Sequence, residues 1–209
     1  MSSRNLLALA LAIATACPSM VCAASQQTSH TQFKGLTAET DFDIFDPSGC
    51  VETFVTVIAI DGSIKLAPGH PAVASGMIVF VSQMDNCTQT QLILADGSAP
   101  LASEQLQISS SLKTASLTAT GEVFDLVSNN TLPVTISLAW VGTGQLGGFE
   151  EHSNFRQPAF GLRSTIRNSG TFRPATAVGT VMVNGSNIVS GTTTGALSST
   201  KQGEVDISH

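Results

Sequence analysis

The fold of this protein is decided by two stretches that each begin with a cysteine: residues 50–60, CVETFVTVIAI, and residues 87–94, CTQTQLIL. The first stretch is rich in apolar and β-branched residues, which favours a strand over a helix, and the second contains the shorter run from Gln89 to Leu94. In the first run, apolar side chains fall on both faces of the expected strand, so we expect both faces to be at least partly covered. The two cysteines would tie these strands together.

Residues 1–24 have the features of an export signal that is removed. Arg4 supplies a short cationic start, residues 6–16 are apolar apart from Thr15, and Ala23 and Ala24 supply a small-residue cleavage site. The apolar run is shorter than the roughly 20 residues that span a bilayer, and no later run approaches that length, so no transmembrane segment is predicted. We therefore expect a secreted protein, extracellular or periplasmic.

Cleavage would remove Cys17 and Cys22 and leave Cys50 and Cys87. An even pair of cysteines in an exported chain predicts a disulfide, with two buried free thiols as the alternative. A loop of this length would stabilise the fold by about 4 kcal/mol in the chain-entropy model. A lipid anchor at Cys17 is a weaker alternative to secretion, because residues 14–17 resemble a bacterial lipobox with alanine in place of the usual leucine.

The remaining chain of about 185 residues is long enough for one domain with a substantial core, at residues 33–209. Residues 25–32 are polar without periodicity and predict a disordered lead. The region from residue 190 is rich in Ser, Thr and Gly, with a last edge strand expected around Val205 and Ile207. Only 11% of the residues are charged and the net charge is −6, so we expect no nucleic-acid partner.

The clearest alternation of apolar and polar residues occurs at 112–125 and again at 134–140. These runs predict a long antiparallel hairpin with one buried face, on which Trp140 lies. Turn-forming residues recur every 8 to 12 positions, which is typical of β-sandwiches and barrels. The expected turns lie at residues 46–49, 61–62, 96–97, 128–131, 168–170 and 184–185. The predicted fold is all-β: an antiparallel β-sandwich or jelly-roll-like barrel of roughly ten strands with one disulfide.

Four arginines, Arg156, Arg163, Arg167 and Arg173, fall within eighteen positions. On a strand, Arg163 and Arg167 would share one face, where their guanidinium groups can bind carboxylate, sulfate or a polyanionic glycan. This is the binding patch that the sequence favours most, for an anionic extracellular ligand or a surface glycan. The alternative is that these arginines pair with acidic strand surfaces elsewhere in the protein.

Two further groups of titratable residues have chemical potential. Glu150 and His152 would lie on one face of a strand and could act as acid, base or metal ligand with a third partner, although a solvated loop is the simpler interpretation. Asp41, Asp43 and Asp46 could supply oxygens to Ca²⁺, although an acidic strand edge that resists pairing accounts for them equally. We predict no cofactor and no metal site.

These features favour a secreted, non-catalytic β-sandwich protein that serves as a binding or structural module. One alternative is an extracellular hydrolase that uses Glu150 or His152 with a distant carboxylate. Another is a self-assembling surface or matrix protein, whose Ser/Thr/Gly-rich tail and open strand edges would pair with other chains. No nucleophile motif accompanies the serines of the chain, which lowers the expectation of an enzyme.

Overall fold

The structure of the protein is a computed structural model that describes residues 27–67, 69–157, 162–189 and 191–208. The predicted signal peptide at 1–24 and the alternative lipid anchor at Cys17 lie outside the described residues. The described residues form twelve strands. These are β1 (Gln27–Phe45), β2 (Val51–Ala67), β3 (Ala72–Val73), β4 (Gly76–Asp85), β5 (Thr90–Pro100), β6 (Leu106–Ile108), β7 (Thr114–Asp125), β8 (Asn130–Gly142), β9 (Gly147–Gln157), β10 (Leu162–Val183), β11 (Ser186–Asn187) and β12 (Thr192–Ser208).

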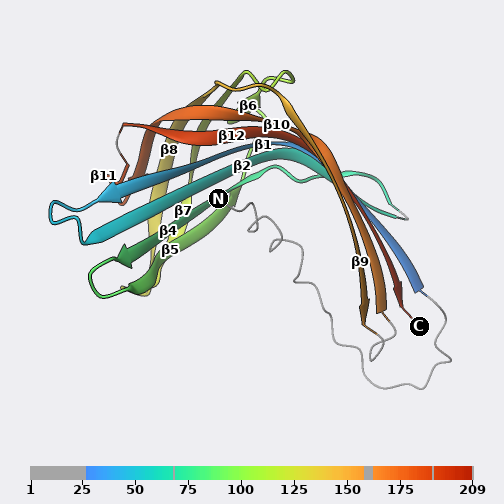
Figure 1. The fold of residues 1–209 in the computed structure, drawn as a ribbon, viewed down its shortest axis with the longest axis horizontal. Coiled ribbons are helices and arrows are strands. Elements are labelled where there is room, and N and C mark those ends of the chain that lie inside the picture. Colours follow the sequence, from blue (N-terminus) through green and yellow to red (C-terminus); the bar gives the residue numbers. More distant parts are fainter. Residues whose placement is uncertain (1–26, 68, 158–161, 190, 209) are drawn as a thin grey trace.

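Eight of these strands pair in the order β1-β12-β10-β8-β7-β5-β4-β2, and β2 pairs with β1 again, so the hydrogen-bonded sheet closes on itself (Figure 1). Every pairing is antiparallel, and among these eight strands those that follow one another in the chain are neighbours in the sheet. The narrowest junction joins β5 to β7 through two residue pairs, and the short β6 continues along β7 beside it. The predicted all-β antiparallel class is confirmed, with the connectivity of a simple meander.

The core fills the inside of the closed sheet, which we call the body. Alternate residues of β7 and β8 point inward and are buried, as the predicted hairpin requires. Trp140 is 1% exposed, and its indole N–H donates a 3.1 Å hydrogen bond to the carbonyl of Glu39 on β1. Trp140 lies on β8, and β10 and β12 stand between β8 and β1 in the sheet, so the indole extends past these two strands to reach Glu39. Gly195 on β12 has no side chain there and leaves room for the indole. Burial of an aromatic ring whose polar group is satisfied stabilises such a core strongly.

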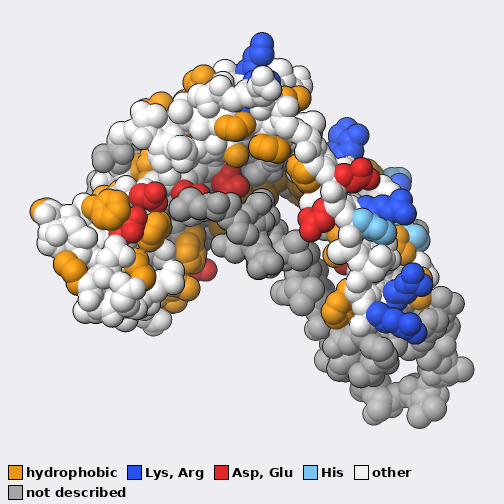
Figure 2. All heavy atoms as spheres, viewed as in Figure 1, with side chains coloured by type: hydrophobic (Ala, Val, Ile, Leu, Met, Phe, Trp, Pro, Cys, Tyr) orange, Lys and Arg blue, Asp and Glu red, His pale blue; other side chains and the backbone are white. Residues whose placement is uncertain are grey.

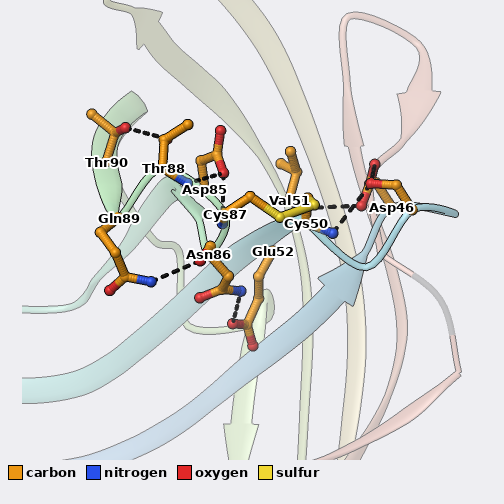
Figure 3. The surroundings of a disulfide bond; sticks show 11 residues. Asp46, Cys50, Val51, Glu52, Asp85, Asn86, Cys87, Thr88, Gln89 and Thr90 are labelled. Carbon is orange, nitrogen blue, oxygen red and sulfur yellow. Dashed lines mark hydrogen bonds between the residues drawn. A yellow bond between two sulfur atoms is a disulfide. The ribbon is translucent and has the colours of Figure 1, made fainter.

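The predicted disulfide is confirmed and joins Cys50 to Cys87, with their Cα atoms 5.3 Å apart (Figure 3). Each cysteine lies in a turn that an aspartate closes. Asp46 accepts hydrogen bonds from the Val51 amide and the Ser48 hydroxyl, and Asp85 accepts them from the amides of Cys87 and Thr88. These hydrogen bonds favour the charged carboxylate, and they hold the pKa values of Asp46 and Asp85 below the usual range.

The predicted turn at 184–185 is also confirmed, and the turn predicted at 128–131 forms two residues earlier, at 126–129, because β8 begins at Asn130. Asn184 and Gly185 both adopt positive φ angles, of 49° and 78°, as a tight hairpin turn needs. The turns predicted at 61–62, 96–97 and 168–170 are wrong, because β2, β5 and β10 continue through them without a break. Neighbouring strands are hydrogen-bonded across these positions, and that pairing overrides the local turn preference.

Five strands extend beyond the body and form a separate lobe of sheet that bends away from it (Figure 1). We call this lobe the arm; it consists of β9 together with residues 27–36, 61–67, 162–172 and 199–208. The predicted disordered lead is wrong from Gln27 onward, because β1 begins there and pairs with β12. The expected edge strand at Val205 and Ile207 is instead internal, since β12 pairs with both β1 and β10.

A row of small residues that ends at Phe149 crosses the base of the arm. Phe149, Gly170, Thr200, Gly35 and Gly62 lie directly opposite one another on five successive strands. A Cβ atom on Gly170 would lie 2.1 Å from the Ser199 carbonyl oxygen and 2.8 Å from the Phe149 ring. Glycines mark places where strands approach closely or a sheet bends sharply, so this row lets the arm leave the body at an angle.

Removal of the disulfide tests how much the covalent link between the two turns contributes to the stability of the fold. A Cys50→Ala/Cys87→Ala variant should lose about 4 kcal/mol of unfolding free energy, because the unfolded chain gains the entropy of an open loop. Urea unfolding of the variant beside the wild type measures the difference. Equal midpoints would show that the disulfide does not stabilise the fold.

The glycine row can be tested at Gly170. Gly170→Ala should cost about 1–3 kcal/mol, because its Cβ must displace the Ser199 carbonyl or the Phe149 ring. Gly203→Ala is the matched control, since no atom lies within 4 Å of a Cβ placed at Gly203 on the same arm. Thermal unfolding compares the two, and an equal effect of both substitutions would contradict the proposed role of the row.

Candidate functional site: a basic face on the arm

One face of the arm gathers most of the cationic side chains. In an antiparallel sheet, residues directly opposite one another share a face, and so do alternate residues of one strand. The register pairs Arg156 with Arg163, His152 with Arg167, and Lys34 with Lys201 on neighbouring strands. No register shift interrupts these ladders. The cationic residues on this face, which we call the basic face, are Arg156, Arg163, Arg167, Lys34, Lys65, Lys201, His30 and His152.

These side chains are all exposed, and Lys, Arg and His side chains cluster over the arm in Figure 2. Six of the eight Lys and Arg residues that the structure describes belong to the basic face. Strands lie about 4.8 Å apart and alternate residues about 6.7 Å apart, so the charges form a lattice roughly 20 Å on a side. A flat lattice of this kind matches a ligand with repeated negative charges.

The pairing of like charges on this face works against stability. Arg156 lies directly opposite Arg163, and Lys34 lies directly opposite Lys201. Like charges in directly opposite positions of a sheet repel and destabilise the strand pair. Features that weaken a fold without any local compensation are typical of functional sites, which supports a binding role for this face.

Charge is separated between the basic face and the rest of the protein. The basic face also carries two carboxylates, Glu150 and Asp61, close to the base of the arm. With six Lys and Arg residues and two acidic residues, the face has an excess of four positive charges. The chain as a whole carries a net charge of −6. The opposite face of the arm carries the acids Glu151, Glu204 and Asp206 instead, beside half-buried apolar side chains. An anionic ligand would therefore approach the arm from one side.

The structure brings together three of the four arginines of the predicted patch. Arg156, Arg163 and Arg167 lie on the basic face, but Arg173 lies beyond the glycine row, beside the core. Arg173 is half-buried and donates a 2.7 Å hydrogen bond to the Gly144 carbonyl, while its Nε atom is buried without a partner among the described residues. Its surroundings are those of a structural arginine.

Sequence reasoning did not find Lys34, Lys65, Lys201 and His30. These residues belong to three different strands, and those on different strands are 31 to 171 positions apart in the chain. Alternation within each strand gives the face of each residue, but no local pattern shows which strands are neighbours. The register between the first and last strands of the chain supplies that information.

Glu150 and His152, the residues of the hydrolase alternative, lie on β9 and share the basic face. The loop expected around them is a strand, so that expectation is wrong. Both side chains are exposed on an open sheet, and Glu151 points to the other face. Among the residues that the structure describes, no three His, Cys, Asp or Glu side chains are grouped closely enough to hold a metal ion.

The three aspartates considered for Ca²⁺ serve different purposes. Asp46 closes a turn, as described above, whereas Asp41 and Asp43 lie on one face of β1. Desolvation raises the pKa of Asp43, and the nearby charges of Glu52 and Asp41 raise it further. Desolvation also raises the pKa of Glu39, with a smaller contribution from Asp41. This acidic strip on the body is a source of mutual repulsion at neutral pH.

An apolar hollow of about 300 Å³ opens at the end of the body. Its lining is continuous with the core, and Asp125 stands at its rim, where its carboxylate accepts hydrogen bonds from Ser128 and Val127. These hydrogen bonds lower the pKa of Asp125. The residues around the hollow are Val81, Leu94, Ala95, Asp125, Val127, Leu132, Val183 and Ile188. With one polar side chain, the hollow offers little to orient a ligand.

No protein-family model matches the sequence, and no curated protein matches it. Among the described residues there is no helix of the length and hydrophobicity that a membrane crossing requires. The basic face is therefore interpreted from its own geometry and charge.

The acidic strip predicts a pH dependence that can be measured. Glu39→Gln should raise the unfolding free energy at pH 7, because the charged carboxylate is penalised in the folded state. The gain should shrink as the pH falls through the raised pKa of Glu39 and vanish below its ordinary value of 4.5. Denaturant unfolding between pH 3 and pH 7 gives the curve.

Asp125→Asn is the control of opposite sign. The pKa of Asp125 is lowered in the folded state, so its stabilisation is present above the ordinary value of 3.8 and is lost as the pH falls through the lowered value. Asp125→Asn should therefore destabilise the protein at pH 7 and have little effect at pH 3. The same sign for both variants at pH 7 would contradict this electrostatic account.

Proposed function

We propose that this protein is an extracellular, non-catalytic binding module whose basic face holds an acidic polysaccharide, such as a sulfated glycan. The observation that carries the proposal is the alignment of six exposed Lys and Arg side chains on one face of the arm. Guanidinium groups form paired hydrogen bonds to sulfate and carboxylate, and ammonium groups add charge without a strict geometry. A lattice of guanidinium and ammonium groups therefore suits a linear polyanion.

The arrangement of the face also favours a repetitive ligand over a small one. The cations are spread over five strands on an open sheet and do not converge on one point. A single small anion would contact only two or three of them, whereas a chain with regularly spaced sulfates could contact most of them at once. The Cys50–Cys87 disulfide is compatible with the oxidising setting in which such glycans occur.

Retention on immobilised heparin in a NaCl gradient tests the proposal. Arg163→Ala/Arg167→Ala should elute at clearly lower salt than the wild type. Each cation removed should lower the slope of log affinity against log salt by about one, because one fewer counterion is released. The effect of salt separates this binding from apolar adsorption.

Lys113→Ala is the charge-matched control for Arg163→Ala, since each substitution removes one positive charge and Lys113 lies on the body, away from the basic face. Lys113→Ala should elute close to the wild type. Equal shifts in the eluting salt concentration for Lys113→Ala and Arg163→Ala would contradict the proposal, and so would a wild type that heparin does not retain. Competition by duplex DNA that is stronger than competition by dextran sulfate would assign the face to nucleic acid instead.

A further inference from the structure

The arm ends in a long strand edge whose protection against pairing, among the described residues, consists of charged side chains, which opposite charges on a partner strand can compensate. Among the described strands, β9 pairs with β10 alone. It is eleven residues long, contains no proline or lysine, and runs beside β10 without a register shift. Long, regular edges without such features are templates for another strand, because their backbone N–H and C=O groups have no partner in the sheet.

Three of the other outer strands among the described residues are short, and the outer edge of β5 is divided into two shorter open segments by its pairing with β7 at Ala95 and Asp96. β3 and β11 have two residues each and β6 has three. Pro71 precedes β3 directly, and a proline at an edge removes a hydrogen-bond donor. The tail strand β12, which the sequence suggested for self-assembly, is paired on both sides. The edge of β9 is therefore the longest regular edge among the described strands to which a strand of another chain could pair.

We propose that two copies of the protein pair through their β9 edges, antiparallel, about a two-fold axis at Ser153. This register places Glu150 of each copy opposite Arg156 of the other, so two cross-strand ion pairs form on one face. His152 then lies opposite Asn154. Opposite charges in directly opposed positions stabilise a strand pair.

Neighbouring registers have poorer charge complementarity. An axis at Glu150 or at Glu151 would place two glutamates directly opposite each other, although the axis at Glu151 would also place Glu150 of each copy opposite His152 of the other. An axis at Asn154 would place His152 opposite Arg156, which are of like charge. An axis at His152 would place Arg156 opposite Gly148 and Glu150 opposite Asn154, and neither charge would be compensated. The charges of β9 thus select the register centred on Ser153.

The dimer has a defined consequence for the arm. A two-fold axis perpendicular to the sheet keeps equivalent faces on the same side, so the two basic faces become one continuous surface. Two linked copies of a binding face hold a long ligand more tightly than one copy does. The contact is confined to one strand edge, which is small for a stable complex, so we expect a weak dimer that depends on protein concentration.

Disulfide trapping tests the register with the full protein. Directly opposed residues of paired strands have Cα atoms about 4.5–5.5 Å apart, which suits a disulfide. Ser153→Cys should form a covalent dimer under mild oxidation, faster than His152→Cys. Ser169→Cys, which is exposed on β10 and away from the edge, is the control. Wild-type protein, in which Cys50 and Cys87 are joined by a disulfide, gives the background.

Charge reversal provides a second test that does not rely on a new cysteine. Glu150→Arg and Arg156→Glu should each reduce dimerisation in sedimentation velocity, and the double variant should restore it, because the ion pairs re-form with exchanged signs. Circular dichroism checks that each variant remains folded. Faster trapping at His152→Cys than at Ser153→Cys, or a double variant no better than the single ones, would overturn the proposal.

The pairing of β9 does not depend on polyanion binding, so the two proposals can fail separately. Dimerisation is measured in the absence of any glycan, whereas heparin retention of Arg163→Ala/Arg167→Ala changes residues on β10, which is not the free edge. A monomer that still binds heparin would reject the dimer alone.

Discussion

The structure depends on β1, whose two edges are hydrogen-bonded along nearly their whole length. β1 pairs with β2 on one side and with β12 on the other, and these ladders close the sheet of the body. The same ladders continue past the body and hold the arm together. Because β1 is paired on both edges among the described residues, its backbone needs no helix to cover it, and the strand can continue from the body into the arm.

The arm and the body use the same strands for different purposes. In the body, alternate residues face inward and pack around Trp140, while their neighbours face solvent. Beyond the row that contains Gly170 and Gly35, the sheet no longer encloses a core, and the corresponding positions include the exposed cations of the basic face. The glycine row thus separates the part of the sheet that is stabilised by burial from the part that is free to carry charge.

The basic face gathers charge at some expense of stability. Two pairs of like charges lie directly opposite each other, and the acidic residues of the chain are concentrated elsewhere. An arrangement selected only for stability would alternate positive and negative charges across the strands. The disulfide and the aspartate-closed turns stabilise the opposite end of β1 and β2, at the far end of these strands from the basic face (Figures 1 and 3).

By itself, the sequence determined the all-β antiparallel class, the Cys50–Cys87 disulfide, the hairpin of β7 and β8, and the burial of Trp140. These features follow from two-residue periodicity and turn chemistry, which act over a few neighbouring positions. The same local reasoning failed at Asp61-Gly62, where pairing on both sides keeps β2 extended through a turn-forming dipeptide. Only the tertiary structure decided that Lys34, Lys201 and Arg163 share a face, because the register between strands at opposite ends of the chain is set by long-range pairing.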